Sequence, residues 1–269
     1  MSGADSDRLI PARPSRLITN WFVRYVTRLF RRRFHSFRIA SDGLQGFRDL
    51  ESSKRPAIVL LNHSAWWDPL VGVVLARGEN TRRPLLAPID RKQLERFKFF
   101  RKLGFFGIDP EDPEALADMR DYVIDAFQAD PRTWLWLTPQ GRFTDVRAPV
   151  RIRPGAARIA AAIPDVDVIS LAIEYVFWQD SKPEVLVRFA RIETEQTSTS
   201  GWQRAMTDGM QANADALSRL VQTRDDDAFH TLIDSGTRSS FIYDIYLRIR
   251  GRHGEIKARR QPEEQAASE

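Results

Sequence analysis

The stretch AIVLLNHSAWWDP, residues 57–69, decides the fold of this 269-residue chain. Its first five residues are apolar without interruption, which is typical of a strand covered on both faces of a parallel sheet. Short apolar runs recur at 84–89, 105–108, 133–137, 166–177 and 184–192, and helical patterns separate most of them. This alternation predicts one α/β domain with a mostly parallel sheet flanked by helices.

The remaining elements are placed by periodicity and by turn residues. A short strand is expected at 37–39, followed by a turn at Ser41–Asp42–Gly43. One helix should follow the first buried strand and run to about Arg77, and others are expected at 91–103, 113–129, 154–163, 202–223 and 239–250. We therefore divide the chain into an arm at 1–34, the α/β domain at 35–250 and a polar, disordered tail at 251–269.

Composition excludes several kinds of chemistry. The chain has no cysteine, so disulfides, thiolate catalysis and cysteine-ligated zinc are ruled out. Its four histidines include no pair at helical i, i+4 spacing, and we expect no metal site. The most apolar stretch, 57–76, is interrupted by polar residues and therefore lacks the roughly 20 consecutive apolar residues that a membrane span needs. With no signal-peptide pattern at the N-terminus, a cytoplasmic location is expected.

The arm is basic and amphipathic. Nine arginines and no acidic residue lie between Arg8 and Arg38. Over residues 16–34, apolar side chains recur at helical spacing on one broad side, with arginines opposite. This pattern predicts a helix on the inner face of the cell membrane, bound to anionic lipids. The alternative is that the apolar side packs on the protein's own core. Both interpretations hold if one edge of the apolar stripe packs on the core and the other edge meets lipid. A helix that binds nucleic acid does not need so apolar a face, so no nucleic-acid partner is expected.

A histidine and an aspartate follow the first buried strand. In an ideal helix, five residues would turn Asp68 about 140° away from His63. Pro69 disfavours helical geometry at Asp68, so a turn at 63–68 can bring the carboxylate back to the imidazole. Asp68 would then fix the ring's tautomer, and His63 would accept a proton from a substrate hydroxyl. The alternative is a structural pair, with His63 in a turn and Asp68 as a helix N-cap.

Several blocks in order resemble the glycerolipid and lysophospholipid acyltransferase family, of the 1-acylglycerol-3-phosphate acyltransferase type. Asn62–His63–(four residues)–Asp68–Pro69 resembles its first motif, and Gly104–Asp109 its second. Pro139–Gln140–Gly141 is similar to the third block, and Arg153–Pro154–Gly155 to a basic residue placed two before a glycine. The apolar run 168–173 resembles the fourth block. The blocks cover about residues 37–173, with the first motif the most specific.

The resemblance implies transfer of a fatty acyl group from acyl-CoA or acyl carrier protein to a hydroxyl of a lipid acceptor. It implies that His63 is the general base and Asp68 its partner, with no cofactor and no metal. Residues implied to bind substrate are Asn62, Pro139, Gln140, Gly141, Arg142 and Arg153. Backbone amides near Gly141 are expected to stabilise the oxyanion, although an ordinary turn explains this glycine equally well.

Four positions depart from the family's pattern. Pro110 stands where the second block has arginine, Gln140 replaces glutamate, and Arg142–Phe143 replaces threonine-arginine. The loss of an arginine removes a charge-assisted contact to an acceptor phosphate. Arg142, Arg147, Arg151 or Arg153 can replace this contact. Otherwise the departures favour an acceptor other than a simple glycerol phosphate, such as a lysophospholipid with a displaced phosphate, an amino-acid lipid or a glycosylated isoprenoid. A silent lipid-binding scaffold and a hydrolase that activates water are the alternative functions.

Overall fold

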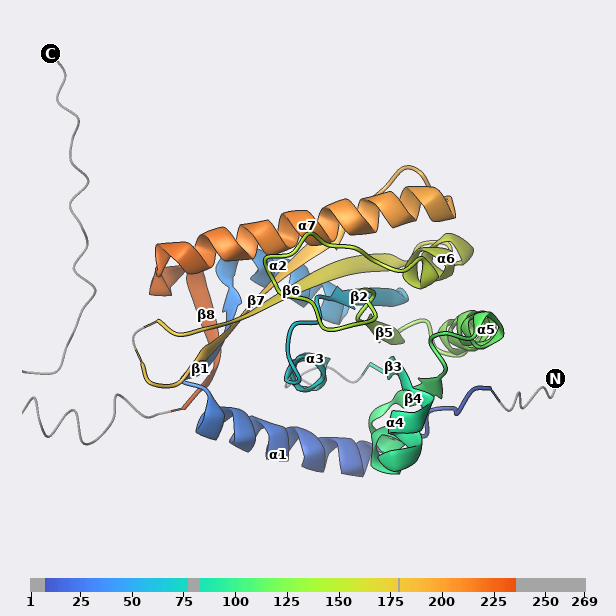
Figure 1. The fold of residues 1–269 in the computed structure, drawn as a ribbon, viewed down its shortest axis with the longest axis horizontal. Coiled ribbons are helices and arrows are strands. Elements are labelled where there is room, and N and C mark those ends of the chain that lie inside the picture. The colour runs from blue at the N-terminus through green and yellow to red at the C-terminus, as the bar shows by residue number, and fades with distance from the viewer. Residues whose placement is uncertain (1–7, 77–82, 179, 236–269) are drawn as a thin grey trace, which may run out of the picture.

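An eight-stranded sheet forms the centre of the molecule (Figure 1). This computed structural model describes residues 8–76, 83–178 and 180–235. The strand order is β4-β3-β5-β2-β6-β7-β1-β8, and only the β6–β7 and β1–β8 pairs are antiparallel. The prediction of a mostly parallel α/β sheet is thus confirmed. The strands are β1 Ser36–Ala40, β2 Ala57–Leu61, β3 Leu85–Asp90, β4 Phe105–Ile108, β5 Trp134–Leu137, β6 Asp167–Val176, β7 Glu184–Ile192 and β8 Phe229–Asp234.

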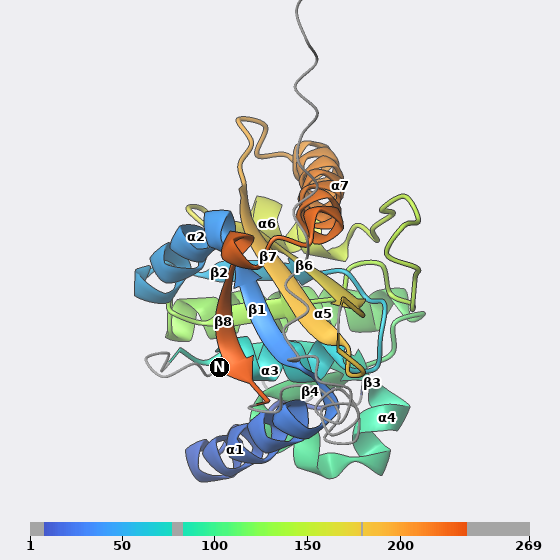
Figure 2. The same ribbon diagram turned by 90° about the vertical axis from the view of Figure 1, so that its left-hand side faces the viewer.

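Helices cover both faces of the sheet. In both ribbon views α1 and α3 lie on one side of it, and α6 and α7 on the other (Figures 1 and 2). The α-helices are α1 Arg16–Arg33, α2 Ser41–Ser52, α3 Asp68–Ala76, α4 Arg91–Arg96, α5 Pro113–Ala129, α6 Gly155–Ala162 and α7 Thr199–Thr223. Two 3-10 helices are η1 Lys98–Leu103 and η2 Asp226–Ala228.

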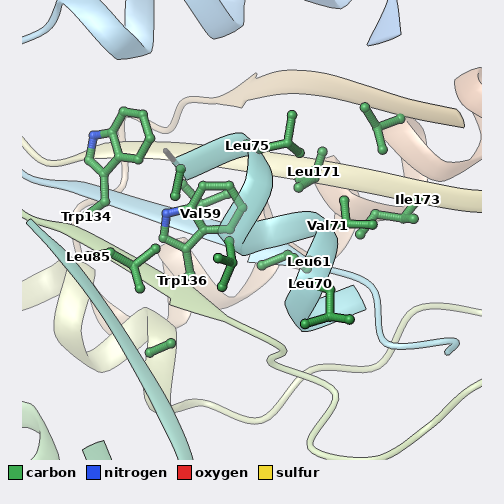
Figure 3. Packing of buried hydrophobic residues seen from close by; sticks show 14 of the residues in the cluster. Val59, Leu61, Leu70, Val71, Leu75, Leu85, Trp134, Trp136, Leu171 and Ile173 are labelled. Atoms are coloured by element: carbon green, nitrogen blue, oxygen red, sulfur yellow. The ribbon is translucent and has the colours of Figure 1, made fainter. Parts of the chain in front are cut away.

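Helix α3 packs directly over the middle of the sheet. Its Val71 and Leu75 belong to one buried cluster with Val59, Trp136 and Leu171, which come from three adjacent strands (Figure 3). All five side chains are at most 4 % exposed. Because burial of each such side chain contributes roughly 1.5–3 kcal/mol, this cluster fixes α3 and its first residue, Asp68, against the strands.

Helix α1 docks by one edge and leaves another edge in solvent. Val26 and Phe30 are at most 1 % exposed and join the buried cluster beneath the sheet. Leu17, Trp21 and Tyr25 are 84 %, 62 % and 51 % exposed. The apolar side thus packs on the core by one edge only, because the stripe is too broad for the core to cover.

Two local expectations were wrong. Residues 41–43 begin helix α2 rather than a turn, because Gly43, Phe47 and Leu50 recur at helical spacing and face the interior. A Cβ at residue 43 would lie 2.8 Å from the backbone nitrogen of Phe189, so glycine allows this close approach. The expected helix 91–103 breaks at Phe97, where ψ is 61°, and continues as η1.

Strand β8 was not predicted from the sequence. Only Phe229 and Ile233 of this strand are buried, so its apolar pattern is weak. It pairs antiparallel with β1 at the edge of the sheet. The expected helix 239–250 and the tail 251–269 lie outside the described residues.

Candidate active site

Two loops meet at the carboxyl ends of β2 and β5. The strands run parallel with Leu60 beside Leu137, so the chain leaves both at the same edge of the sheet. The backbone N–H of His63 donates to Gln140 Oε1 at 3.0 Å, and the Thr144 N–H donates to the His63 carbonyl at 2.7 Å. The loop after β5 therefore fixes the backbone of His63 on both sides.

The expected contact between His63 and Asp68 is present. His63 Nδ1 lies 3.0 Å from Asp68 Oδ2, and residues 63–67 leave the strand without forming a helix. The same oxygen accepts the backbone N–H groups of Ser64 and Ala65 at 2.8 and 2.9 Å. A carboxylate oxygen can only accept, so this arrangement favours the tautomer in which Nδ1 carries the proton and donates. Asp68 begins α3, whose helix dipole also favours its negative charge.

The second oxygen of Asp68 has a partner of its own. The hydroxyl of Tyr175, on β6, donates to Asp68 Oδ1 at 2.7 Å, and Asp68 is 0 % exposed. Burial, followed by the negative charge of Asp68 and this hydrogen bond, holds the pKa of Tyr175 well above 10. The tyrosine thus stays a donor at any pH at which the protein works.

The other side of the imidazole is open. His63 Nε2 forms no hydrogen bond within the described part of the chain, and the side chain is 18 % exposed. The ring of Phe143 lies beside the imidazole, with 4.1 Å between the ring centroids. Phe143 and the nearby Trp66 are 61 % and 68 % exposed. Nε2 is thus flanked by exposed aromatic side chains.

The remaining residues expected to bind substrate make contacts within the protein. Asn62 uses its side chain on the backbone of Ile173, accepting from the N–H at 2.7 Å and donating to the carbonyl at 2.9 Å. Pro139 is buried, and its carbonyl accepts the Arg153 N–H. These contacts join the loop ends to β6 and to the segment before α6. Asn62 and Pro139 therefore position the site, independently of any contact with substrate.

Gly141 adopts a left-handed φ of +68°, as the turn requires. A Cβ there would lie 2.8 Å from Arg153 Nε. Its N–H donates to the Thr138 carbonyl at 3.0 Å, so this amide is used within the turn and does not serve an oxyanion. Among the described residues, no group accepts the N–H of Arg142 or Phe143.

Two arginines lie near the turn and differ in their contacts. Arg142 is exposed beside the site. Arg153 binds the carbonyl of Pro110 at 3.2 Å and Glu111 at 2.9 Å. Pro110 is the position at which the sequence lacks an expected arginine, so Arg153 brings a cation to the same place from another segment.

Glu174 and a small cavity lie next to the site. Burial raises the pKa of Glu174. With Asn62, Gln140 and Thr144 it lines a cavity of about 10 Å³. That is room for about one water molecule, so the cavity is not a site for a lipid chain.

Sequence reasoning missed two of the contacts at the His63–Asp68 pair. Strand alternation puts Tyr175 on the same face of β6 as Ile173 and Leu171, but it does not reveal that β6 lies beside β2. The contact of Thr144 is made by its backbone, which no side-chain pattern reveals. The aromatics near the site differ in burial: Phe105, Phe106, Trp134 and Trp136 are core residues, whereas Trp66 is exposed.

In residues 8–76, 83–178 and 180–235, no three acidic or imidazole side chains gather closely enough to hold a metal ion. None of the described helices is both long and apolar enough to cross a bilayer.

Comparison with known proteins identifies the family. The model of a family described as Acyltransferase matches residues 39–174, half of the chain, including both site loops. The fold is similar to the crystal structure of the 1-acyl-sn-glycerophosphate (LPA) acyltransferase PlsC from Thermotoga maritima. The TM-score is 0.50 at 12 % identity, over 76 % of this chain and 81 % of that one. No curated protein sequence matches. The match across His63, Asp68 and the loop after β5 shows that the chain belongs to the acyltransferase family.

Proposed function

We propose that the chain moves a fatty acyl group from an acyl thioester, acyl-CoA or acyl carrier protein, to a hydroxyl of a glycerolipid or lysophospholipid-like acceptor. The hydrogen bond between His63 Nδ1 and buried Asp68 is the observation that supports this most strongly. It fixes the tautomer that leaves Nε2 as an open acceptor. The family match and the likeness to a lysophosphatidic acid acyltransferase support the same substrate class.

The reaction needs one proton carrier. Nε2 of His63 accepts the proton of the acceptor hydroxyl as its oxygen attacks the thioester carbonyl. Asp68 stabilises the resulting imidazolium, and the amides of Arg142 and Phe143 are proposed to bind the oxyanion. The carbon–sulfur bond then breaks, and the imidazolium returns the proton to the thiolate. The products are an ester and a free thiol.

The departures from the family's pattern bear on the acceptor. Gln140 keeps the acceptor oxygen that binds the His63 backbone, so the loss of glutamate's charge does not open the site. Phe143, however, places an exposed aromatic ring where the family's third block ends in arginine. A phosphate would have to meet Arg142 or Arg153 instead.

Thiol release tests the proposed reaction. Because the protein contains no cysteine, a thiol reagent reports only the released CoA or carrier-protein thiol. Palmitoyl-CoA or palmitoyl carrier protein is mixed with lysophosphatidic acid, lysophosphatidylcholine or a glycosylated isoprenoid. We expect release that depends on one acceptor, with the matching ester found by mass spectrometry. Thiol and free palmitate without acceptor would show a hydrolase, and lipid binding without turnover a scaffold; either outcome overturns the proposal.

We further propose that the exposed edge of α1 binds the membrane on its cytoplasmic side. Trp21 and Tyr25 stack at 6.0 Å, and Phe22 contacts Phe99 of η1 at 5.1 Å. Phe97 and Phe99 are themselves 44 % and 37 % exposed, so they extend the apolar surface beyond the helix. Exposed basic residues surround it, namely Arg24, Arg28, Lys98 and Lys102. Aromatics within a basic rim suit an anionic lipid surface.

Vesicle sedimentation tests this surface. The variant carrying Trp21→Ser and Tyr25→Ser is expected to bind phosphatidylglycerol-containing vesicles at least about tenfold more weakly, because two aromatic side chains no longer enter lipid. Phe177→Ser is the matched control, since Phe177 is 64 % exposed in the β6–β7 connection. Equal binding of the double variant and the wild type would contradict the proposal.

A further inference from the structure

Tyr175 contacts the carboxylate that orients the candidate base, although it belongs to none of the sequence blocks that predict the site. It lies on β6, whereas His63 and Asp68 lie in the connection between β2 and α3. Strands β2 and β6 are parallel neighbours with Leu61 beside Leu171. Because β6 continues past this point to Val176, its last residues run alongside the loop that carries His63.

The hydrogen bonds of Asp68 are divided unequally between its two oxygens. Oδ2 takes three donors, namely His63 Nδ1 and the N–H groups of Ser64 and Ala65. Oδ1 takes one side-chain donor, the hydroxyl of Tyr175, at 2.7 Å. Loss of that donor leaves a fully buried carboxylate oxygen without its side-chain partner, which is costly for an ionised group. The carboxylate then gains by turning toward other donors, and the geometry at His63 changes with it.

Packing holds the tyrosine ring in this orientation. The ring of Phe34, directly after α1, lies 6.0 Å from that of Tyr175 and 4.9 Å from that of Trp67. Phe34 is 3 % exposed. A donor fixed in this way keeps its geometry when charge develops on the imidazole, so it needs no reorganisation during the reaction.

The geometry points to Tyr175 as a positioning residue that acts through Asp68 to hold the imidazole of His63 in its productive tautomer and orientation. This inference rests on the proposed function. Tyr175 touches neither acyl donor nor acceptor in this role. Its removal should therefore affect kcat and leave KM for both substrates within about twofold.

The test is a double-mutant cycle with Tyr175→Phe and Asp68→Asn. Tyr175→Phe alone is expected to lower kcat about tenfold, the equivalent of one hydrogen bond to a charged group. In the Asp68→Asn background the same change should cause no further loss, because the group through which it acts is gone. Tyr122→Phe is the matched control, since the Tyr122 hydroxyl accepts the Ala12 N–H away from the site. Equal losses from Tyr175→Phe in both backgrounds would show a merely structural role and overturn the inference.

A second readout does not require turnover. In protein labelled with ¹⁵N-histidine, His63 should show a single Nδ1–H tautomer, identified by its disappearance in His63→Gln. Tyr175→Phe is expected to mix the two tautomers, while Tyr122→Phe leaves them unmixed. An unmixed Nδ1–H tautomer in Tyr175→Phe would contradict the inference. A mixed signal in a protein that transfers no acyl group would uphold the inference and defeat the proposed function alone.

Discussion

Replacement of His63 by alanine is expected to lower kcat for acyl transfer by about 10²–10⁴-fold, the usual contribution of a positioned general base. Nε2 is the open nitrogen of an imidazole whose other nitrogen is held 3.0 Å from Asp68. Alanine removes the proton acceptor without disturbing the backbone contacts to Gln140 and Thr144, which use the N–H and carbonyl of residue 63. KM for the acyl donor should change little, because the imidazole does not bind it.

The measurement is the initial rate of thiol release over a range of donor and acceptor concentrations. His230→Ala is the matched control, because His230 is exposed on the edge strand β8. It should keep wild-type kcat. Circular dichroism and a thermal melt must show that His63→Ala remains folded. If the folded variant retained more than about a tenth of wild-type kcat, His63 would not be the base.

The second large effect is on stability. Replacement of Arg83 by methionine is expected to lower the free energy of unfolding by about 3–5 kcal/mol. Arg83 is only 4 % exposed. Its guanidinium donates to the carbonyls of Arg132 at 2.7 Å, Leu50 at 2.7 Å and Ser53 at 2.6 Å, and also to that of Arg55. It thereby joins the end of α2 to the chain entering β2 and β5.

Burial also affects the charge of this arginine. Desolvation, opposed by the negative charge of Asp167, lowers the pKa of Arg83 to about 10. The guanidinium is still charged at neutral pH, and it lies 4.9 Å from the ring centre of Trp134. Methionine would fill the space but leave the buried carbonyls without their donor, and each such group costs about 1–3 kcal/mol.

Urea unfolding followed by tryptophan fluorescence measures this loss. Arg147→Met serves as the control, because Arg147 is 84 % exposed and its ion pair with Asp145 is a surface contact. Such pairs contribute about 0–1 kcal/mol. A midpoint for Arg83→Met that matches the control would show that water replaces the guanidinium at the carbonyls.

The sequence predicted the centre of the molecule well, because strong local signals agree there. Uninterrupted apolar residues specify β2, and Pro69 marks the change from loop to helix that brings Asp68 back to His63. Helix α2 and strand β8 were missed because few of their residues are buried and their apolar patterns are correspondingly weak.

The partners of the site depend on strand order, which local patterns do not encode. Tyr175 reaches Asp68 only because β6 is the neighbour of β2 and continues past its end. The turn contact of the Gly141 amide could likewise not be predicted from the sequence, since it depends on the backbone conformation at one residue. The pair itself was predictable from sequence, whereas the groups that hold it required the fold.

The docked edge of α1 has a consequence for how this protein can be divided. Phe30 and Phe34 both contact Trp67, the residue before Asp68, with ring centroids 5.8 and 4.9 Å apart. An N-terminal deletion ending at residue 34 would therefore remove the aromatic contacts that support Trp67 and Tyr175, together with the exposed side chains of α1. A shortened version would need new residues to support Trp67 and Tyr175, whereas substitutions on the exposed edge of α1 leave this support in place.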